Sequence, residues 1–174
     1  MPTALLSQLY PAHLATLQQR TAQALQRGGY DHLVIAAGLP HYQFLDDRTD
    51  AFAVNPHFKA WLPVTKAPGS WLVITPGQRP KLVYLQPHDY WHVVPAAPSG
   101  YWVEHFDIAI IREPQQALEH LPRDLARCAI LGEPQAAQGA AVPNNPEAVL
   151  NHLHWHRAWK TAYELAMMRV AAKL

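Results

Sequence analysis

Asp46 and Asp47 form the one adjacent pair of carboxylates in this 174-residue sequence. Neighbouring side chains do not necessarily face each other, so the pair is a poor general acid and base couple by itself. A loop-capping role or a salt bridge to Arg48 is the plainer interpretation. General acid–base chemistry is therefore not predicted from this pair alone.

The eleven histidines supply two further patterns. His88 and His92 have the i, i+4 spacing of metal ligands on a helix, but no Glu follows His88 as a zinc protease requires. His152, His154 and His156 would lie on one helix, where the middle residue points away from the other two. Structural or surface roles are favoured for these histidines, and no metal site is predicted in this chain.

Other catalytic signatures are missing from the sequence. It has no glycine-rich phosphate loop, serine nucleophile elbow or CxxC pair. The net charge of +1 provides no large positive field for nucleic acid or an anionic membrane. The lone Cys128 lies in an apolar run, and no secretory signal or membrane span is visible. We therefore expect a cytoplasmic domain with no nucleic-acid or membrane partner.

Hydrophobic periodicity predicts the elements that carry these residues. Helices are expected over 9–27, 115–121, 147–158 and 162–174, and strands over 32–37, 71–75, 81–85, 106–111 and 126–131. The strands 71–75 and 81–85 form a hairpin, and 40–63 is mostly loop. The predicted fold is α/β, with three layers in which helices flank a mixed β-sheet.

The predicted C-terminal helix has an unusual composition. Thr161 and Glu164 have the spacing of a capping box, and the residues that follow are apolar nearly all round the helix. Such a helix needs burial on several sides. It either docks on its own domain or contacts a partner in another subunit or in sequence beyond Leu174, and we favour truncation of the natural protein.

Several segments together resemble the N-terminal domain of bacterial enzymes of the creatinase/prolidase family. They are His13–Thr21, Gln43–Asp47, Phe52–Val64, Lys81–Leu85, His88–His92, Tyr101–Trp102, Asn151–Thr161 and Tyr163–Arg169. The resemblance covers essentially the whole chain, and Val54–Trp61 together with His88–His92 is its most specific part.

The resemblance implies a domain of ribonuclease-H-like outline over residues 1–158. Residues 159–174 would be a linker and the start of a pita-bread catalytic domain. That absent domain would bind two divalent metal ions, commonly manganese, and hydrolyse dipeptides with C-terminal proline. The expected partners are this chain's own catalytic domain, a second subunit in a homodimer and the Xaa-Pro substrate. This chain alone is expected to be inactive.

The resemblance also suggests three residues for the rim of the active site. Family members are dimers in which the loop containing Asp47 approaches the partner's active site, where a carboxylate could bind the substrate's amino terminus. Tyr90 and Trp91 could offer flat faces to a proline ring, although core or dimer contacts are equally compatible. A self-contained histidine-based metal or zinc-hydrolase domain and a pure dimerisation module stay open as alternatives.

Overall fold

The hydrophobic runs of the chain form a five-stranded mixed sheet in this computed structural model, which describes residues 2–90, 93–134 and 141–172. The strand order is β4-β3-β2-β1-β5. The strands are β1 (His32–Ala36), β2 (Trp71–Ile74), β3 (Lys81–Leu85), β4 (Asp107–Ile111) and β5 (Cys128–Leu131). The helices are α1 (Pro2–Gly28), α2 (Pro56–Trp61), α3 (Glu147–Arg157) and α4 (Ala162–Ala171), with 3-10 turns η1 (Val103–His105), η2 (Pro114–Glu119) and η3 (Leu125–Arg127). The predicted α/β fold with a mixed sheet flanked by helices is confirmed.

Strand direction divides the molecule into two ends. β2 runs antiparallel to both of its neighbours, β1 and β3, while β4 is parallel to β3 and β5 is parallel to β1. Four strands therefore point the same way and only β2 runs against them. We call the end where β1 and β3 finish the loop edge, and the opposite end, where β2 turns into β3, the hairpin end.

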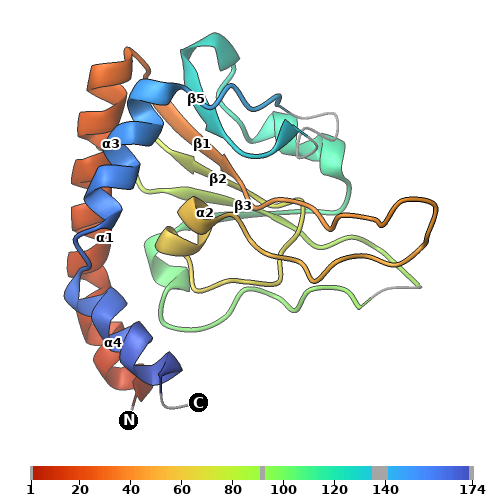
Figure 1. The fold of residues 1–174 in the computed structure, drawn as a ribbon, viewed down its shortest axis with the longest axis horizontal. Coiled ribbons are helices and arrows are strands. Elements are labelled where there is room, and N and C mark those ends of the chain that lie inside the picture. The colour runs from red at the N-terminus through yellow and green to blue at the C-terminus, as the bar shows by residue number, and fades with distance from the viewer. Residues whose placement is uncertain (1, 91–92, 135–140, 173–174) are drawn as a thin grey trace.

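Each sheet face has its own core because successive side chains on a strand point to opposite faces. Leu33, Leu72 and Leu82 lie in the core beneath the α-helices. Val34, Val73 and Val83 lie in a second core with residues from η2 and the segment after it, including Ala117 and Leu121. The α-helices cover only the first face, as Figure 1 shows, and 3-10 turns with loops cover the second.

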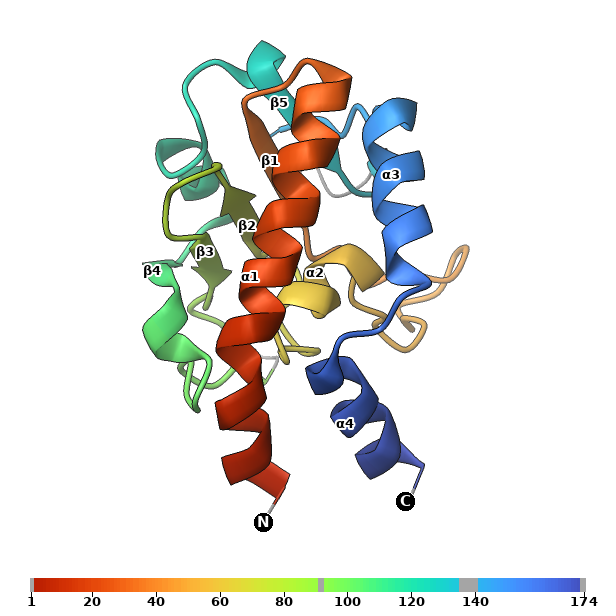
Figure 2. The ribbon, with the colours of Figure 1, turned by 90° about the vertical axis from the view of Figure 1, so that its left-hand side faces the viewer.

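The long helix α1 spans one side of the molecule, and α3 and α4 run back along it in the opposite direction (Figure 2). The predicted start of this helix at Leu9 is wrong, because the helix begins at Pro2. Tyr10 and Leu6 are buried one and two turns before Leu14, respectively, so they continue the apolar stripe toward the N-terminus. Pro11 is exposed, so water can donate a hydrogen bond to the helix carbonyl that is left without a partner because proline has no amide hydrogen.

Other boundaries differ from the prediction for local reasons. The fifth strand begins at Cys128 because the Asp124 side chain accepts a hydrogen bond from the Ala126 amide (3.1 Å) and holds residues 125–127 in a 3-10 turn. The short helix expected at 115–121 is the 3-10 turn η2. The loop expected over 40–63 contains α2, which is capped by the Asn55 side chain. The Thr161–Glu164 capping box is confirmed, with both reciprocal hydrogen bonds formed.

The edge strand β5 is protected by two asparagines that follow it in the chain. The Asn144 side chain accepts from the Ile130 amide (2.8 Å) and donates to the Cys128 carbonyl (2.9 Å). The Asn145 side chain makes the same pair of bonds with the amide and carbonyl of Gly132. These amide groups satisfy backbone positions that an uncovered edge would offer to another chain.

An aromatic cluster joins α1 to α2, α4 and the segment before β4. The Tyr10 hydroxyl donates to the Trp61 carbonyl across 2.6 Å, and the Tyr10 ring contacts those of Tyr101 and Tyr163 at 5.4 and 5.1 Å between centroids. The hydroxyls of Tyr101 and Tyr163 are 2.8 Å apart. Burial raises the pKa of both Tyr10 and Tyr163, so the two phenols remain protonated hydrogen-bond donors.

The Tyr10→Phe variant should lose about 1–3 kcal/mol of unfolding free energy, because the buried Trp61 carbonyl loses its donor while the ring packing is kept. Urea unfolding followed by tryptophan fluorescence measures this loss. The matched control is Tyr42→Phe on the surface, which should change stability by less than about 0.5 kcal/mol. Equal stability of the two variants would contradict the assigned role of the Tyr10 hydroxyl.

Candidate functional site

Two loops extend from the loop edge, one after β1 and one after β3. Figure 1 shows both reaching away from α1, toward the right of the view, and Figure 2 shows them emerging at different positions along the sheet. They contain Asp47 and Tyr90 respectively. The parallel orientation of β1 and β3 brings the two predicted rim segments to the same end of the molecule.

The first loop folds into a small hairpin that we call the 41–50 arm. Tyr42 and Thr49 form an antiparallel bridge, and the Gln43 amide donates to the Arg48 carbonyl (2.9 Å). The Asp50 amide donates to the His41 carbonyl, also across 2.9 Å. Every residue from 41 to 50 is exposed, so these backbone bonds, rather than a core, hold the shape of the arm.

Asp46 and Asp47 both lie at the tip of the arm, but their side chains have different surroundings. Asp46 caps the turn, since its Oδ1 accepts a hydrogen bond from the Arg48 amide (3.0 Å). In the described part of the chain, the Asp47 side chain makes no hydrogen bond or ion pair. Phe44 and Leu45 beside them are each 91% exposed. The tip therefore presents apolar surface and an available carboxylate to whatever lies opposite.

The second loop adds more apolar surface to the same end of the molecule. Tyr90 is 91% exposed and Val93 is 97% exposed. Trp91 and His92 lie outside the described residues, so the wall predicted for Trp91 and the His88–His92 pair stay predictions. Single exposed apolar residues are ordinary on a protein surface, but several on two projecting loops indicate an interaction surface.

The helical histidines follow the geometry expected from their spacing. The rings of His152 and His156 are 4.4 Å apart on one face of α3, whereas His154 lies on another face. His154 instead meets His57 of α2, with 3.2 Å between the two Nε2 atoms and the rings nearly parallel. Because α2 and α3 are far apart in sequence, no local pattern could have revealed this pair.

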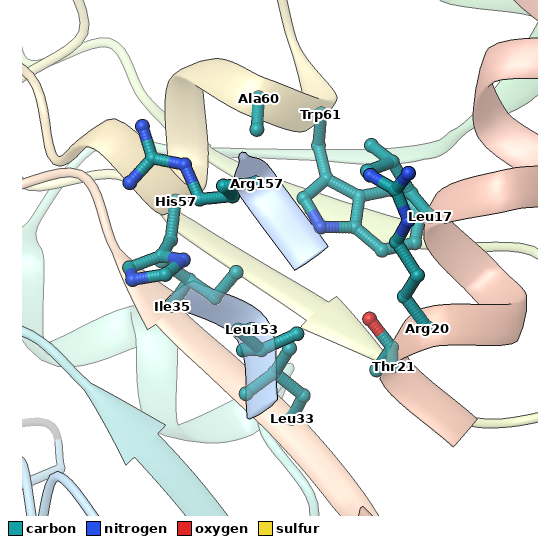
Figure 3. A pocket seen from close by; sticks show the side chains of 10 residues that line it. All are labelled: Leu17, Arg20, Thr21, Leu33, Ile35, His57, Ala60, Trp61, Leu153 and Arg157. Carbon is teal, nitrogen blue, oxygen red and sulfur yellow. The ribbon is translucent and has the colours of Figure 1, made fainter. Parts of the chain in front are cut away.

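A small cavity lies beside this histidine pair, between α1, α2, α3 and the sheet (Figure 3). Its volume is about 30 Å³, which is room for only one or two water molecules. Figure 3 shows the heads of Arg20 and Arg157 on opposite sides of the opening. The cavity is too small for a dipeptide or an organic cofactor.

Burial favours the neutral form of His57, which lines this cavity, and of His152 on α3. Burial, with Arg157 and His154 nearby, lowers the pKa of His57 from 6.5 to about 4. Burial also lowers the pKa of His152, with a smaller contribution from His156. Among residues 2–90, 93–134 and 141–172, no group of three or more His, Cys, Asp or Glu side chains could hold a metal ion. The described residues do not fit a metal centre.

Cys128 and the helices complete the survey of possible functional features. Burial raises the pKa of the Cys128 thiol to about 11, so it is not a thiolate nucleophile near neutral pH. Within the part of the chain that the structure describes, no helix has the length and apolar character needed to cross a membrane.

Comparison with known proteins identifies the family of this chain. The family described as "Xaa-Pro dipeptidase, N-terminal domain" matches residues 8–155. The chain belongs to this family.

Relatives with the same name align along nearly the whole chain. A Xaa-Pro dipeptidase of Stenotrophomonas maltophilia (strain R551-3) is 63% identical over 166 residues, which cover 95% of this chain and 38% of the relative. One of Xanthomonas euvesicatoria pv. vesicatoria (strain 85-10) is 60% identical over all 174 residues, or 40% of the relative. One of Xanthomonas campestris pv. campestris (strain B100) is 63% identical over 169 residues. The chain thus spans about two fifths of the length of these curated relatives.

The family match confirms the sequence-based resemblance, but the exposed surface at the loop edge was only partly visible in the sequence. Asp47 lies in a loop as the sequence predicted, whereas the exposed tip formed by Phe44 and Leu45 was not predicted. Their apolar character could have suggested a buried strand as easily as an arm. The Tyr42–Thr49 bridge makes this segment a hairpin, and the exposure of all residues from 41 to 50 shows that it projects into solvent.

Acidification should destabilise the domain through His57. The unfolded histidine binds a proton near pH 6.5, and the folded one only near pH 4. The contribution of the neutral His57 ring to the unfolding free energy is therefore fully present above pH 6.5 and is lost as the pH falls toward 4. At roughly 1.4 kcal/mol for each unit of pKa, the loss is on the order of 3 kcal/mol. Urea unfolding at several pH values between 7 and 4 measures it.

The matched variants are His57→Gln and His88→Gln, since His88 is exposed. The first should have a shallower dependence of stability on pH than the unmodified chain, and the second should keep the full dependence. The buried His13 and His152, whose pKa values are also lowered, contribute equally to both variants. Identical pH dependence in the two would contradict the assignment to His57.

Proposed function

We propose that this chain is the N-terminal, non-catalytic domain of a Xaa-Pro dipeptidase, and that it contributes to dimerisation and to the rim of the active site in the partner subunit. The identity of about 60% to proteins with that name supports the activity of the parent protein. Cys128, the single cysteine, is buried and forms no disulfide, which is compatible with a cytoplasmic location for the parent protein.

The 41–50 arm is the observation that carries the proposed role. It projects from the loop edge with Phe44 and Leu45 almost fully exposed, which is an unfavourable arrangement unless another surface covers them. Interface centres are typically apolar with polar groups at the rim, and Asp46 and Asp47 stand beside the apolar tip. The arm thus combines a surface for packing on a second subunit with a carboxylate that could face that subunit's substrate.

The proposed substrate is a dipeptide with proline in the second position. Asp47 would accept a charge-assisted hydrogen bond from the free amino terminus of that dipeptide. Its carboxylate has no partner in the described part of the chain, whereas Asp46 is used by the turn. Tyr90, and Trp91 next to it, would pack aromatic faces against the proline ring.

The reaction itself would depend on residues outside this chain. We propose that two divalent metal ions, commonly manganese in this family, are held by the part of the parent protein that this chain does not span. When bound, the ions would activate a water molecule for attack on the peptide carbonyl. Because the described residues do not fit a metal centre, we assign this chain only positioning and packing roles.

The helix α4 would connect this domain to the catalytic one, with the boundary near residue 158. Tyr163 is buried against α1, but Leu165, Met168 and Val170 of the same helix are exposed, Met168 by 55%. Trp155 and Trp159 on and after α3 are exposed as well. We propose that residues 159–174 are a linker whose exposed apolar side chains pack on the following catalytic domain.

Two other functions predict different results. A self-contained metal-binding domain or zinc hydrolase would use the paired His57 and His154, whose Nε2 atoms are close enough to bind the same metal ion. A pure dimerisation module would use the arm without any contact to substrate. The first differs from our proposal in the activity of the chain alone, and the second in the kinetic effect of Asp47.

The 174-residue chain by itself should not hydrolyse an Xaa-Pro dipeptide, because the described residues provide no metal centre. The measurement is proline release in the presence of manganese or zinc, with the full-length parent protein as the positive control. Turnover by the isolated chain that disappears in a His57→Gln variant would support the histidine-based hydrolase and refute our proposal.

In the full-length protein, Asp47→Asn should raise KM for the dipeptide by about tenfold or more, the equivalent of one lost charge-assisted hydrogen bond, with the dimer intact. The matched control is Asp46→Asn, which removes the same charge but keeps the oxygen that caps the turn. Steady-state kinetics and analytical ultracentrifugation test both variants. Unchanged kinetic constants for Asp47→Asn in an intact dimer would favour the pure dimerisation module.

A further inference from the structure

A second and larger hollow lies at the hairpin end of the sheet, on the opposite end from the 41–50 arm. Its volume is about 420 Å³, and it is formed by the ends of strands β1 to β4, the β2–β3 connection and the segment 120–123. In Figure 2 the β2–β3 connection and the segment after η2 are seen at the upper left of the sheet. Nothing in the proposed peptidase role uses this hollow.

Strand alternation explains why polar side chains gather there. His32, Lys81 and Asp107 are the first residues of β1, β3 and β4, and Lys81 lies directly beside Asp107 in the parallel pair. All three are in phase with Val34 and Val83 of the second core, so they point to the face that lacks α-helices. Three strands therefore contribute one ionisable side chain each to the same face, where the sheet begins.

Buried residues form the floor of the hollow, and backbone hydrogen bonds fix one of its walls. Val73 and Leu121 line it and belong to the second core. The backbone amides of His120 and Leu121 both donate to the Ala117 carbonyl, at 3.0 and 3.1 Å, which fixes the segment that closes one side. Nδ1 of His32 is 2.8 Å from the Thr75 hydroxyl. These contacts hold the segment 120–121 and the start of β1 beside the hollow.

Positive charge dominates the lining. Arg79, Lys81 and Arg123 line the hollow with a single carboxylate, Asp107. The Arg79–Asp107 pair is long, at 3.9 Å, so it does not occupy the hydrogen-bonding fork of the guanidinium. His32 and His120 add two more groups able to donate hydrogen bonds. Since the whole chain has a net charge of only +1, this concentration of positive charge is local.

We propose that this hollow binds a small molecule that carries a phosphate group. Two guanidinium groups and an ammonium group match the charge and the oxygens of a phosphate dianion better than those of a neutral or cationic ligand. The volume falls within the roughly 300–1,000 Å³ of small-molecule pockets, so there is room for an organic portion beside the phosphate. The apolar floor of Val73 and Leu121 would contact that portion.

The test is a titration of the ¹⁵N-labelled 174-residue chain with pyrophosphate at constant ionic strength, followed by NMR. Saturable shifts should be confined to residues 32, 73–81, 107 and 120–123. Arg79→Ala and Arg123→Ala should each weaken binding by about tenfold, the effect of one charge-assisted hydrogen bond. Asp107→Asn should tighten it, and this gain cannot result from misfolding.

The matched control is Arg48→Ala, which removes an exposed positive charge at the other end of the chain and should leave the affinity unchanged. A titration with citrate separates phosphate from carboxylate ligands. Tighter binding of citrate at the same residues, an equal loss of affinity in Arg48→Ala, or the absence of saturation would each overturn the proposal.

Discussion

The imidazole of His13 is the contact on which the arrangement of the helices depends. Nε2 donates to the Ala60 carbonyl at the end of α2, and Nδ1 is 2.8 Å from the Thr161 hydroxyl that caps α4. Burial lowers the pKa of His13, so the ring is neutral near pH 7. Because a carbonyl only accepts, the hydrogen is on Nε2 and Nδ1 accepts from Thr161. One buried ring on α1 thereby fixes both neighbouring helices.

This junction also determines which surfaces are left for partners. Thr161 accepts from the Glu164 amide while it bonds to His13, so the start of α4 is held against α1. Tyr163 is then buried and Met168 faces outward. The apolar surface of α4 and the neighbouring Trp159 is consequently a result of how the helix is anchored. That anchoring makes this face available to the catalytic domain in the proposed function.

Strand direction separates two kinds of surface in the same way. The loops that leave β1 and β3 reach one end, where apolar groups and Asp47 are exposed on the 41–50 arm. The first residues of β1, β3 and β4 reach the other end, where Lys81 and its neighbours line a basic hollow. Had β3 run in the opposite direction, Lys81 and Tyr90 would have exchanged ends. The proposed peptide-facing and phosphate-binding surfaces are therefore kept apart by the sheet itself.

The sequence alone determined most strands, the mixed α/β fold, the capping box at Thr161 and the family, because these depend on local periodicity, local hydrogen bonds and segment order. It also singled out Asp47. Only the tertiary structure decided that His57 meets His154, that Phe44 and Leu45 form an exposed tip, and that ionisable side chains from three strands converge around Lys81. The histidine pair and the cluster around Lys81 depend on helix docking and strand order, which bring together residues far apart in the chain, and no local pattern encodes such distances. The tip depends on backbone hydrogen bonds within residues 41–50, which the apolar side chains of Phe44 and Leu45 do not indicate.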